Sequence, residues 1–153
     1  PNAGVAVPAL SRAEFDDVLD MRLLLEGEAA ERGALRVHDA QVQELQLLCE
    51  RMARALSEGR GTAYLEANED FHVTLYRAAG SPSLMSLIET VWLKVGPISN
   101  RLFEHAQALT VLNDGHEDLV RALEKRDGMA ARRAIERDLF VAGQFLRQGL
   151  GKS

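Results

Sequence analysis

Apolar residues along this chain recur every three or four positions, the spacing that places side chains on one face of an α-helix. The first such stretch follows Ser11-Arg-Ala-Glu14, a capping-box sequence whose Ser and Glu side chains satisfy backbone amides at a helix start. It predicts a long helix over residues 12–36. The apolar stripe of this helix comprises Phe15, Val18, Leu19, Leu25 and Ala29.

Turn and capping residues divide the rest of the chain into further helices. Asp39 is expected to cap the second helix, and Ser81-Pro82 supplies the N-cap and first-position proline of the fourth. Gly96-Pro97 is expected to break or kink that fourth helix. After the helix at 12–36, the predicted helices cover residues 40–58, 62–79, 82–95, a segment continuing to about 108, 114–125 and 128–148, with 109–113 as a short connection.

These elements predict an all-α fold, an antiparallel bundle of about six to seven helices with short loops. No segment alternates apolar and polar residues as a half-buried strand would, and no internal repeat is visible. Residues 1–10 hold two prolines and no periodicity, so we expect a linker or tail there and one helical domain over 11–150. Because the chain begins at Pro1 rather than Met, we expect it to be part of a longer protein.

Composition and charge narrow the classes of function. The 153 residues are 46% hydrophobic and 27% charged, which is typical of a soluble domain with a real core. A net charge of −5 leaves no broad basic surface for phosphates, so we expect no direct nucleic-acid binding by these residues. Neither a membrane-spanning run nor a signal peptide is visible, which favours a cytoplasmic protein with no membrane partner. The single cysteine, Cys49, excludes an internal disulfide, and its apolar stripe indicates an inert thiol.

Three of the predicted helices carry polar residues on faces expected to be buried. Asn68 and His72 lie four positions apart and therefore project from one helix face, which is otherwise apolar. His116 and Asp138 lie on the apolar stripes of two later helices. Buried polar groups are costly unless they have partners, so the four residues together suggest a shared internal site.

Two imidazoles, a carboxylate and an amide form a donor set suited to a divalent metal. Imidazole and carboxylate ligands suit zinc, nickel, manganese or iron, and helix bundles build such sites from facing helices. Three or four protein ligands leave coordination positions for water or a bound acid. We therefore predict that the metal ligands are Asn68, His72, His116 and Asp138.

Each of the four residues also has a purely structural interpretation. Asn68 can hydrogen-bond a neighbouring helix, and a lone His on an apolar stripe can be a core residue with satisfied nitrogens. Asp138 can pair with a nearby arginine, Arg133 or Arg137. Periodicity alone does not establish that the three helix faces converge.

Four stretches of the sequence resemble one family. The run from Asn68-Glu-Asp-Phe-His72 to Ala-Ala-Gly80 is similar to the Asp-x-x-Phe-His…Ala-Gly-Asn motif of the FCD ligand-binding domain. Residues 21–30 resemble the family's Arg-x-x-x-Glu first helix, and residues 116–123 resemble its His-x-x-Ile-x-x-Ala-Ile segment. Residues 126–139 are similar to its Gly-Asp-x-x-x-Ala…Met-x-x-His-Leu segment. The resemblance extends over nearly the whole chain.

This resemblance implies the effector-binding half of a FadR-type regulator of the GntR transcription-factor family. Such domains form homodimers, and a separate N-terminal winged-helix domain, absent from this chain, binds the DNA. Many hold a divalent metal through one Asp and three His, with a small carboxylate effector at or beside it. His72 and His116 match that set, whereas Asn68 stands at the Asp position and Asp138 at the last His position.

Four further residues are candidates for effector binding. Arg22 could grip a carboxylate bidentately, or it could form a local ion pair with Glu26 four positions away. Arg101 could act similarly or could simply be exposed to solvent. Ser99 and Asn100 share its segment and could line a pocket.

The sequence thus predicts a sensor of a small organic acid that controls DNA binding through the missing domain. A ligand must bind one helix arrangement better than another to transmit a signal. Two other classes stay open. One is a metal-dependent enzyme, although no nucleophile–base pair or His-Glu-x-x-His sequence is present, and the other is a structural dimerisation domain. The apolar helix that carries Trp92 could supply a dimer surface or part of the core.

Overall fold

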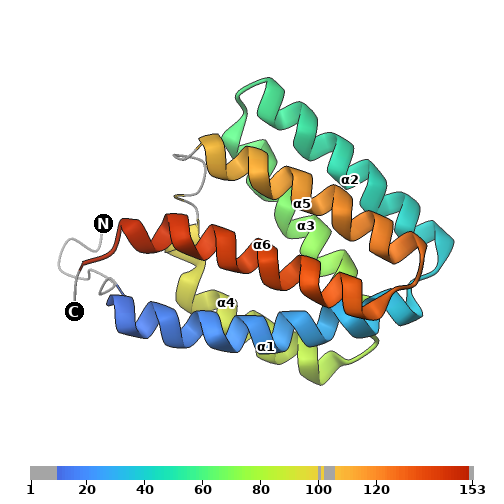
Figure 1. Ribbon diagram of the computed structural model, residues 1–153, viewed down its shortest axis with the longest axis horizontal. Coiled ribbons are helices and arrows are strands. Elements are labelled where there is room, and N and C mark those ends of the chain that lie inside the picture. The colour runs from blue at the N-terminus through green and yellow to red at the C-terminus, as the bar shows by residue number, and fades with distance from the viewer. Residues whose placement is uncertain (1–9, 100, 102–105, 152–153) are drawn as a thin grey trace, which may run out of the picture.

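Six α-helices make up the part of the chain that the computed structural model describes, which is residues 10–99, 101 and 106–151 (Figure 1). No strand occurs within those residues. The all-α bundle predicted from the sequence is therefore confirmed, with the lower of the two helix numbers. The helices are α1 (Arg12–Arg36), α2 (Asp39–Ser57), α3 (Gly61–Arg77), α4 (Pro82–Ser99), α5 (Ala106–Glu124) and α6 (Gly128–Gln148).

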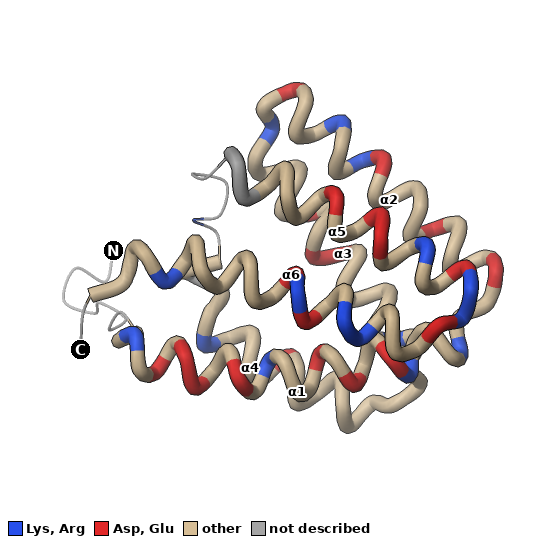
Figure 2. The backbone as a smooth tube through the Cα atoms, in the orientation of Figure 1, with Lys and Arg blue, Asp and Glu red and all other residues tan. Residues whose placement is uncertain are grey.

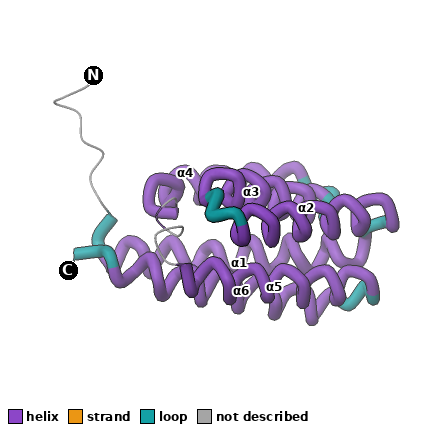
Figure 3. Tube along the Cα trace, turned by 90° about the horizontal axis from the view of Figure 1, so that it is seen from above, coloured by secondary structure: helices purple, strands orange, loops and turns teal. Residues whose placement is uncertain are grey.

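The helices form two layers, with α2, α3 and α4 in one and α1, α5 and α6 in the other (Figure 3). Within the second layer α1 and α6 lie side by side and run antiparallel (Figure 1). Their pairing is fixed at one end by Arg147, whose Nε donates to Asp16 Oδ1 at 2.9 Å. Further along, Arg132 Nε donates to Glu31 Oε1 at 2.7 Å. Acidic residues outnumber basic ones on α1, and basic residues outnumber acidic ones on α6 (Figure 2).

Capping residues begin α1 and α4 where the sequence predicts. The capping box of α1 is present, because Ser11 Oγ accepts from Glu14 N at 3.1 Å and Glu14 Oε1 accepts from Ser11 N at 3.2 Å. Ser81 Oγ accepts from Leu84 N at 3.2 Å and so caps α4. The prediction for α2 is wrong by one residue, since His38 occupies the N-cap position and Asp39 is the first helical residue.

Two predicted helix boundaries are wrong. Gly96-Pro97 does not end α4, which continues to Ser99, and a kink at this point stays a prediction. A proline removes only its own backbone N–H from the helix ladder, so a helix can continue past it for a final turn. Residues 109–113 are not a connection but lie inside α5, because their apolar side chains, Leu109 and Leu112, are buried in the core. Residues 100 and 102–105, which precede α5, lie outside the described residues.

The core lies between the two layers and takes apolar residues from all six helices. Phe71, Leu75, Ile135 and Leu123 are fully buried there, and the stripe predicted for α1 is buried except for Leu25, which is partly exposed. Cys49 is a free, partly buried thiol whose pKa is raised by burial to about 12, in keeping with the unreactive cysteine predicted. Among the described residues, no helix combines the length and apolarity needed to cross a bilayer.

Candidate functional site

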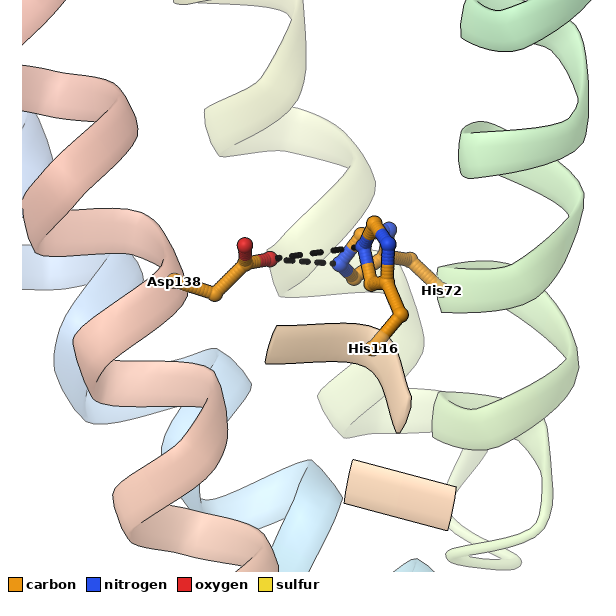
Figure 4. Close-up of side chains that lie close together, drawn as sticks. All are labelled: His72, His116 and Asp138. Atoms are coloured by element: carbon orange, nitrogen blue, oxygen red, sulfur yellow. Dashed lines mark hydrogen bonds and ion pairs between the residues drawn. The ribbon is translucent and has the colours of Figure 1, made fainter. Parts of the chain in front are cut away.

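Three helices bring two histidines and one aspartate together between the two layers. His72 comes from α3, His116 from α5 and Asp138 from α6 (Figure 4). One ligand atom from each residue lies within 4.8 Å of the other two. Asp138 Oδ2 is 3.2 Å from His72 Nε2 and 3.8 Å from His116 Nε2. The predicted convergence of these three helix faces is thus present in the structure.

His72 is oriented by its own helix. Its Nδ1 lies 2.7 Å from the backbone carbonyl oxygen of Asn68, one turn earlier on α3. A carbonyl oxygen can only accept, so Nδ1 carries the proton, and Nε2 is the atom that faces Asp138. Metal-binding histidines are commonly held in this way, with one ring nitrogen bonded to a carbonyl and the other directed at the site.

His116 is 1% exposed, and neither of its ring nitrogens has a hydrogen-bond partner among the described residues. The ring packs against Phe71, with centroids 5.0 Å apart, and against the edge of His72 at 5.5 Å. The Oδ1 oxygen of Asp138 is also buried without a partner within the same described part of the chain. Buried polar atoms without partners are rare and costly, so these atoms fit a site built to receive a bound group.

Burial and mutual charge shift the pKa values of the cluster in different directions. Burial lowers the pKa of His116 to about 4, so the ring is neutral near pH 7. Burial also acts to lower the pKa of His72, but the hydrogen bond to Asp138 and its negative charge outweigh that effect and raise it. For Asp138, burial acts to raise the carboxyl pKa, but its interactions with His116 and His72 and the positive charge of Arg22 outweigh that effect and lower it. The site therefore holds an ionised carboxylate beside an imidazole that is neutral near pH 7.

These residues fit a divalent cation on the chemistry of their donor atoms. His72 Nε2, His116 Nε2 and Asp138 Oδ2 converge as imidazole and carboxylate donors, a combination that suits several first-row metals. Three protein ligands leave further coordination positions for water or an exogenous carboxylate.

The structure also bears on the purely structural interpretations of Asp138 and Asn68. Asp138 pairs with the two histidines, and Arg137 instead pairs with Asp118 at 3.7 Å. Asn68 contributes its backbone carbonyl to the orientation of His72. Participation of the Asn68 side-chain amide in the site stays a prediction.

A second buried polar group adjoins the cluster on the side of α1. Arg22 Nε donates to Glu26 Oε2 at 2.7 Å, and Tyr76 Oη donates to Glu26 Oε1 at 2.9 Å. The Tyr76 ring lies 5.8 Å from the ring of His72, so this group is next to the candidate metal ligands. The predicted ion pair between Arg22 and Glu26 is therefore present, and it is buried, with Glu26 only 1% exposed.

The other three residues predicted to contact the effector are Ser99, Asn100 and Arg101. Ser99 Oγ donates to the Val95 carbonyl at 3.0 Å, which is a local helix contact. Arg101 is exposed to solvent. Asn100 lies outside the described residues. Effector binding by these residues stays a prediction.

Tyr64 and Tyr76 are further polar residues beside the site that the sequence pattern does not single out. Both tyrosines continue the spacing of Asn68 and His72, because residues 64, 68, 72 and 76 recur every fourth position on α3. That spacing was visible, but aromatic residues on a buried stripe are ordinary core residues. What distinguishes them is visible only in the structure: the Tyr64 hydroxyl has no partner among residues 10–99, 101 and 106–151, and Tyr76 bonds to Glu26.

Comparison with known proteins yields one family match and several relatives. The model of the FCD domain family matches residues 17–140. The HTH-type transcriptional repressor RspR of Escherichia coli is 26% identical over 148 residues, which cover 97% of this chain and 65% of RspR. The HTH-type transcriptional regulator McbR of the same species is 23% identical over 137 residues, covering 88% of this chain and 62% of McbR. The chain thus spans less than two thirds of the length of these relatives.

Solved structures share the fold. The structure of E. coli McbR/YncC superposes with a TM-score of 0.87 at 23% identity, covering 94% of this chain and 72% of that one. A Streptococcus agalactiae GntR structure gives a TM-score of 0.70 at 23% identity, covering 86% of this chain and 58% of that one. At this identity the likeness establishes the helical arrangement alone.

Proposed function

The chain belongs to the FCD domain family, the effector-binding part of GntR-family transcriptional regulators, and from this premise we propose that its interior site senses a small carboxylic acid through a divalent metal. His72, His116 and Asp138 would hold the metal. The bound ion would supply a positive charge to which the carboxylate of the effector binds. The relatives are transcriptional regulators, and we propose that this chain likewise acts as a sensor and not as an enzyme.

The observation that carries the proposal is the convergence of donor atoms with unmet hydrogen-bonding capacity. Three helices direct ligand atoms within 4.8 Å of one another, and both nitrogens of His116 are buried without a partner among the described residues. A satisfied structural histidine would have a hydrogen-bond partner for at least one nitrogen. A coordinated metal would use the lone pair of Nε2 and turn this costly arrangement into a binding site.

Charge supports the role of the metal in acid binding. Within the described residues, the charges around the site are already paired: Arg22 with Glu26, and Asp138 with His72. An anionic effector entering without a metal would therefore meet carboxylates but no unpaired positive charge. A divalent cation would supply that charge.

In the full-length protein, we propose that effector binding changes the packing of these helices and thereby DNA binding by an N-terminal domain in the cytoplasm. A ligand that contacts α3, α5 and α6 at once favours one arrangement of the two layers over others. We also propose a homodimer. On α4 the side chains of Leu87 and Leu93 are 55% and 82% exposed, which leaves an apolar surface for a second copy.

Metal content and acid binding test the proposal together. We expect elemental analysis of untreated protein to find about one divalent ion per chain, and the His72→Ala and His116→Ala variants to lose it. The exposed His38 serves as the matched control, and His38→Ala should retain the ion. A panel of carboxylic acids should raise the melting temperature of the metal-loaded wild type only, because ligands that bind the folded state stabilise it.

Other results would point to the alternative functions. Stoichiometric metal retained by both His72→Ala and His116→Ala would mean that other residues are the ligands. Absence of any shift with metals and acids would favour a structural dimerisation domain. Metal-dependent conversion of an acid into a product would favour an enzyme.

A further inference from the structure

A small cavity lies between α5 and α6, beside the metal-binding cluster. Its volume is about 20 Å³, which is room for one water molecule. Residues of both helices line it, among them Gly115, Asp118, Arg137, Asp138 and Val141. Asp138 directs its Oδ2 oxygen at the two histidines of the cluster and is also part of the cavity wall (Figure 4). One metal ligand therefore connects the cluster to this cavity.

Gly115 leaves space on the α5 side of the cavity. Among the described residues of neighbouring helices, a Cβ atom on Gly115 would meet only Asp138 Oδ1, at 4.0 Å. That oxygen is buried and has no hydrogen-bond partner within the same part of the chain. We call the space between Gly115 and Asp138 the α5/α6 seam. A larger side chain at position 115 would narrow it.

Charged side chains stand at the outer end of the α5/α6 seam. Asp118 of α5 and Arg137 of α6 form an ion pair across it, with an N–O distance of 3.7 Å and side chains that are 47% and 66% exposed. Both residues line the same cavity as Asp138, so the cavity extends from solvent-exposed groups to a metal ligand. An exposed ion pair of this kind contributes little stability and separates readily.

Other sides of the cluster are covered by buried side chains. Phe71 is 0% exposed and packs on the ring of His116, with centroids 5.0 Å apart. Tyr76 is 1% exposed, adjoins His72 at 5.8 Å and donates to Glu26, which is itself 1% exposed. An ion approaching from these sides would have to displace closely packed or hydrogen-bonded groups. The α5/α6 seam offers a less obstructed path.

We propose that a divalent metal ion enters and leaves the cluster through the α5/α6 seam, where Asp118 attracts the cation at the surface and Asp138 receives it inside. This route rests on the proposed function, because it requires the cluster to bind a metal. A hydrated ion is larger than a cavity for one water molecule. Passage therefore requires the ion to lose water or α5 and α6 to separate locally, and either step makes entry sensitive to the size of residue 115.

A route differs from a ligand in its effect on rates and equilibrium. Uptake and release through one passage cross the same barrier, so narrowing the passage slows both by the same factor and leaves the Kd unchanged. Loss of a metal ligand instead raises the Kd, because it weakens the bound state. The two roles are therefore separable by measuring both rates and the Kd in each variant.

The direct test is stopped-flow uptake of cobalt(II) by the metal-free chain, followed by the visible absorption of the bound ion, with release measured into a chelator. We expect Gly115→Leu to slow uptake and release by about tenfold or more at an unchanged Kd, because added methylene groups obstruct a packed seam. Gly115→Ala should slow both to a smaller extent. Gly96→Ala in α4 is the matched control, since nothing among the described residues lies within 4 Å of its added Cβ.

Charge at the outer end gives a second test with opposite signs. Asp118→Asn should slow cobalt uptake by about threefold at low ionic strength, and Arg137→Gln should accelerate it, because charges at an entrance steer ions. Both effects should disappear in about 1 M salt, where exposed charges are screened. Glu117→Gln is the matched control, because Glu117 lies toward α2, where its charge acts on the pKa of Cys49. It should leave the rate close to that of the wild type.

Two results would overturn the route and are distinct from failure of the proposed function. Wild-type uptake and release rates in both Gly115→Leu and Gly115→Ala would exclude the α5/α6 seam. A weaker Kd at an unchanged uptake rate would also exclude it, since residue 115 would then act on the bound state. If the wild-type chain binds no divalent ion, the proposed metal site itself is wrong and the route falls with it.

Discussion

At the scale of single residues, the state of His116 governs the site. The ring is 1% exposed, packs on Phe71 and has no hydrogen-bond partner among the described residues. Burial therefore holds it neutral and lowers its pKa to about 4. A neutral imidazole with a free lone pair is ready to bind a metal without first losing a proton. The same arrangement makes the metal-free protein sensitive to acid.

The sign of that acid sensitivity follows from the two pKa values of His116. In the unfolded chain the pKa is near the ordinary 6.5, and in the folded chain it is about 4, so between these values the unfolded state binds more protons. We expect the contribution of His116 to the free energy of unfolding to fall by about 3 kcal/mol as the pH drops from 6.5 to 4. Denaturant unfolding of the metal-free protein at several pH values between 6.5 and 4 measures this fall in the free energy of unfolding.

A His116→Leu variant separates this effect from that of His72. The raised pKa of His72 acts in the opposite direction, since its stabilisation is present at low pH and is lost as the pH rises through that pKa. The difference in stability between wild type and His116→Leu should therefore shift in favour of the variant as the pH falls. A difference that does not change with pH would show that His116 is protonated or solvated in the folded protein.

At the scale of helices, α1 and α3 pack closely because of one glycine. A Cβ atom placed on Gly33 would lie 2.7 Å from the backbone oxygen of Leu75 and 3.2 Å from its Cδ1. Backbone atoms cannot move aside as a flexible side chain can, so only glycine permits this contact. The approach keeps α1, which carries Glu26, beside α3, which carries Tyr76 and His72.

Substitution of Gly33 by alanine should therefore separate the two helices. We expect Gly33→Ala to destabilise the chain by about 1–3 kcal/mol, the usual cost of overpacking, and to lower metal affinity because His72 moves with α3. Gly96→Ala is the matched control in α4, where nothing lies within 4 Å of the added Cβ. It should stabilise the protein by about 0.5–1 kcal/mol through helix propensity. Urea unfolding of both variants measures these changes in stability. Equal changes for Gly33→Ala and Gly96→Ala would contradict the close approach of α1 and α3 at Gly33.

At the scale of the whole molecule, the site joins the two layers of the bundle. His72 belongs to the layer of α2, α3 and α4, whereas His116 and Asp138 belong to the layer of α1, α5 and α6 (Figure 3). A ligand at this position binds both layers at once, so its occupancy is coupled to how they pack. α4 lies in the first layer, contacts α1 and carries exposed leucines, which connects the interior to the proposed dimer surface.

The dimer surface can be tested on the same chain. We expect light scattering of wild-type protein to give about twice the chain mass of 16.9 kDa, and Leu93→Glu to give the monomer mass, because a charge cannot be buried at an apolar interface without a partner. Leu47→Glu is the matched control, since Leu47 on α2 is 62% exposed. It should leave the dimer intact. A dimer that survives Leu93→Glu but not Leu47→Glu would place the interface on α2.

The sequence by itself determined the helical fold and most of the cluster. Period-3.6 stripes and the Ser11 and Ser81 caps are local, so they predict helices without knowledge of the rest of the chain. Local rules failed at residues 109–113, where burial in the core keeps a helix that turn propensity would end. They also placed the end of α4 too early, since α4 continues past Gly96-Pro97 to Ser99. The polar residues on apolar stripes were visible because a buried polar side chain breaks a local pattern.

Only the tertiary structure decided which of those residues meet. His72, His116 and Asp138 are separated by dozens of positions in sequence, and their convergence depends on helix packing angles that periodicity does not contain. The same packing pairs Tyr76 with Glu26 and leaves the Tyr64 hydroxyl without a partner in the described part of the chain. Whether a polar group is satisfied is a property of its neighbours across the bundle. The sequence therefore identifies candidate residues for the site, and the packing of the helices determines which of them lie close together.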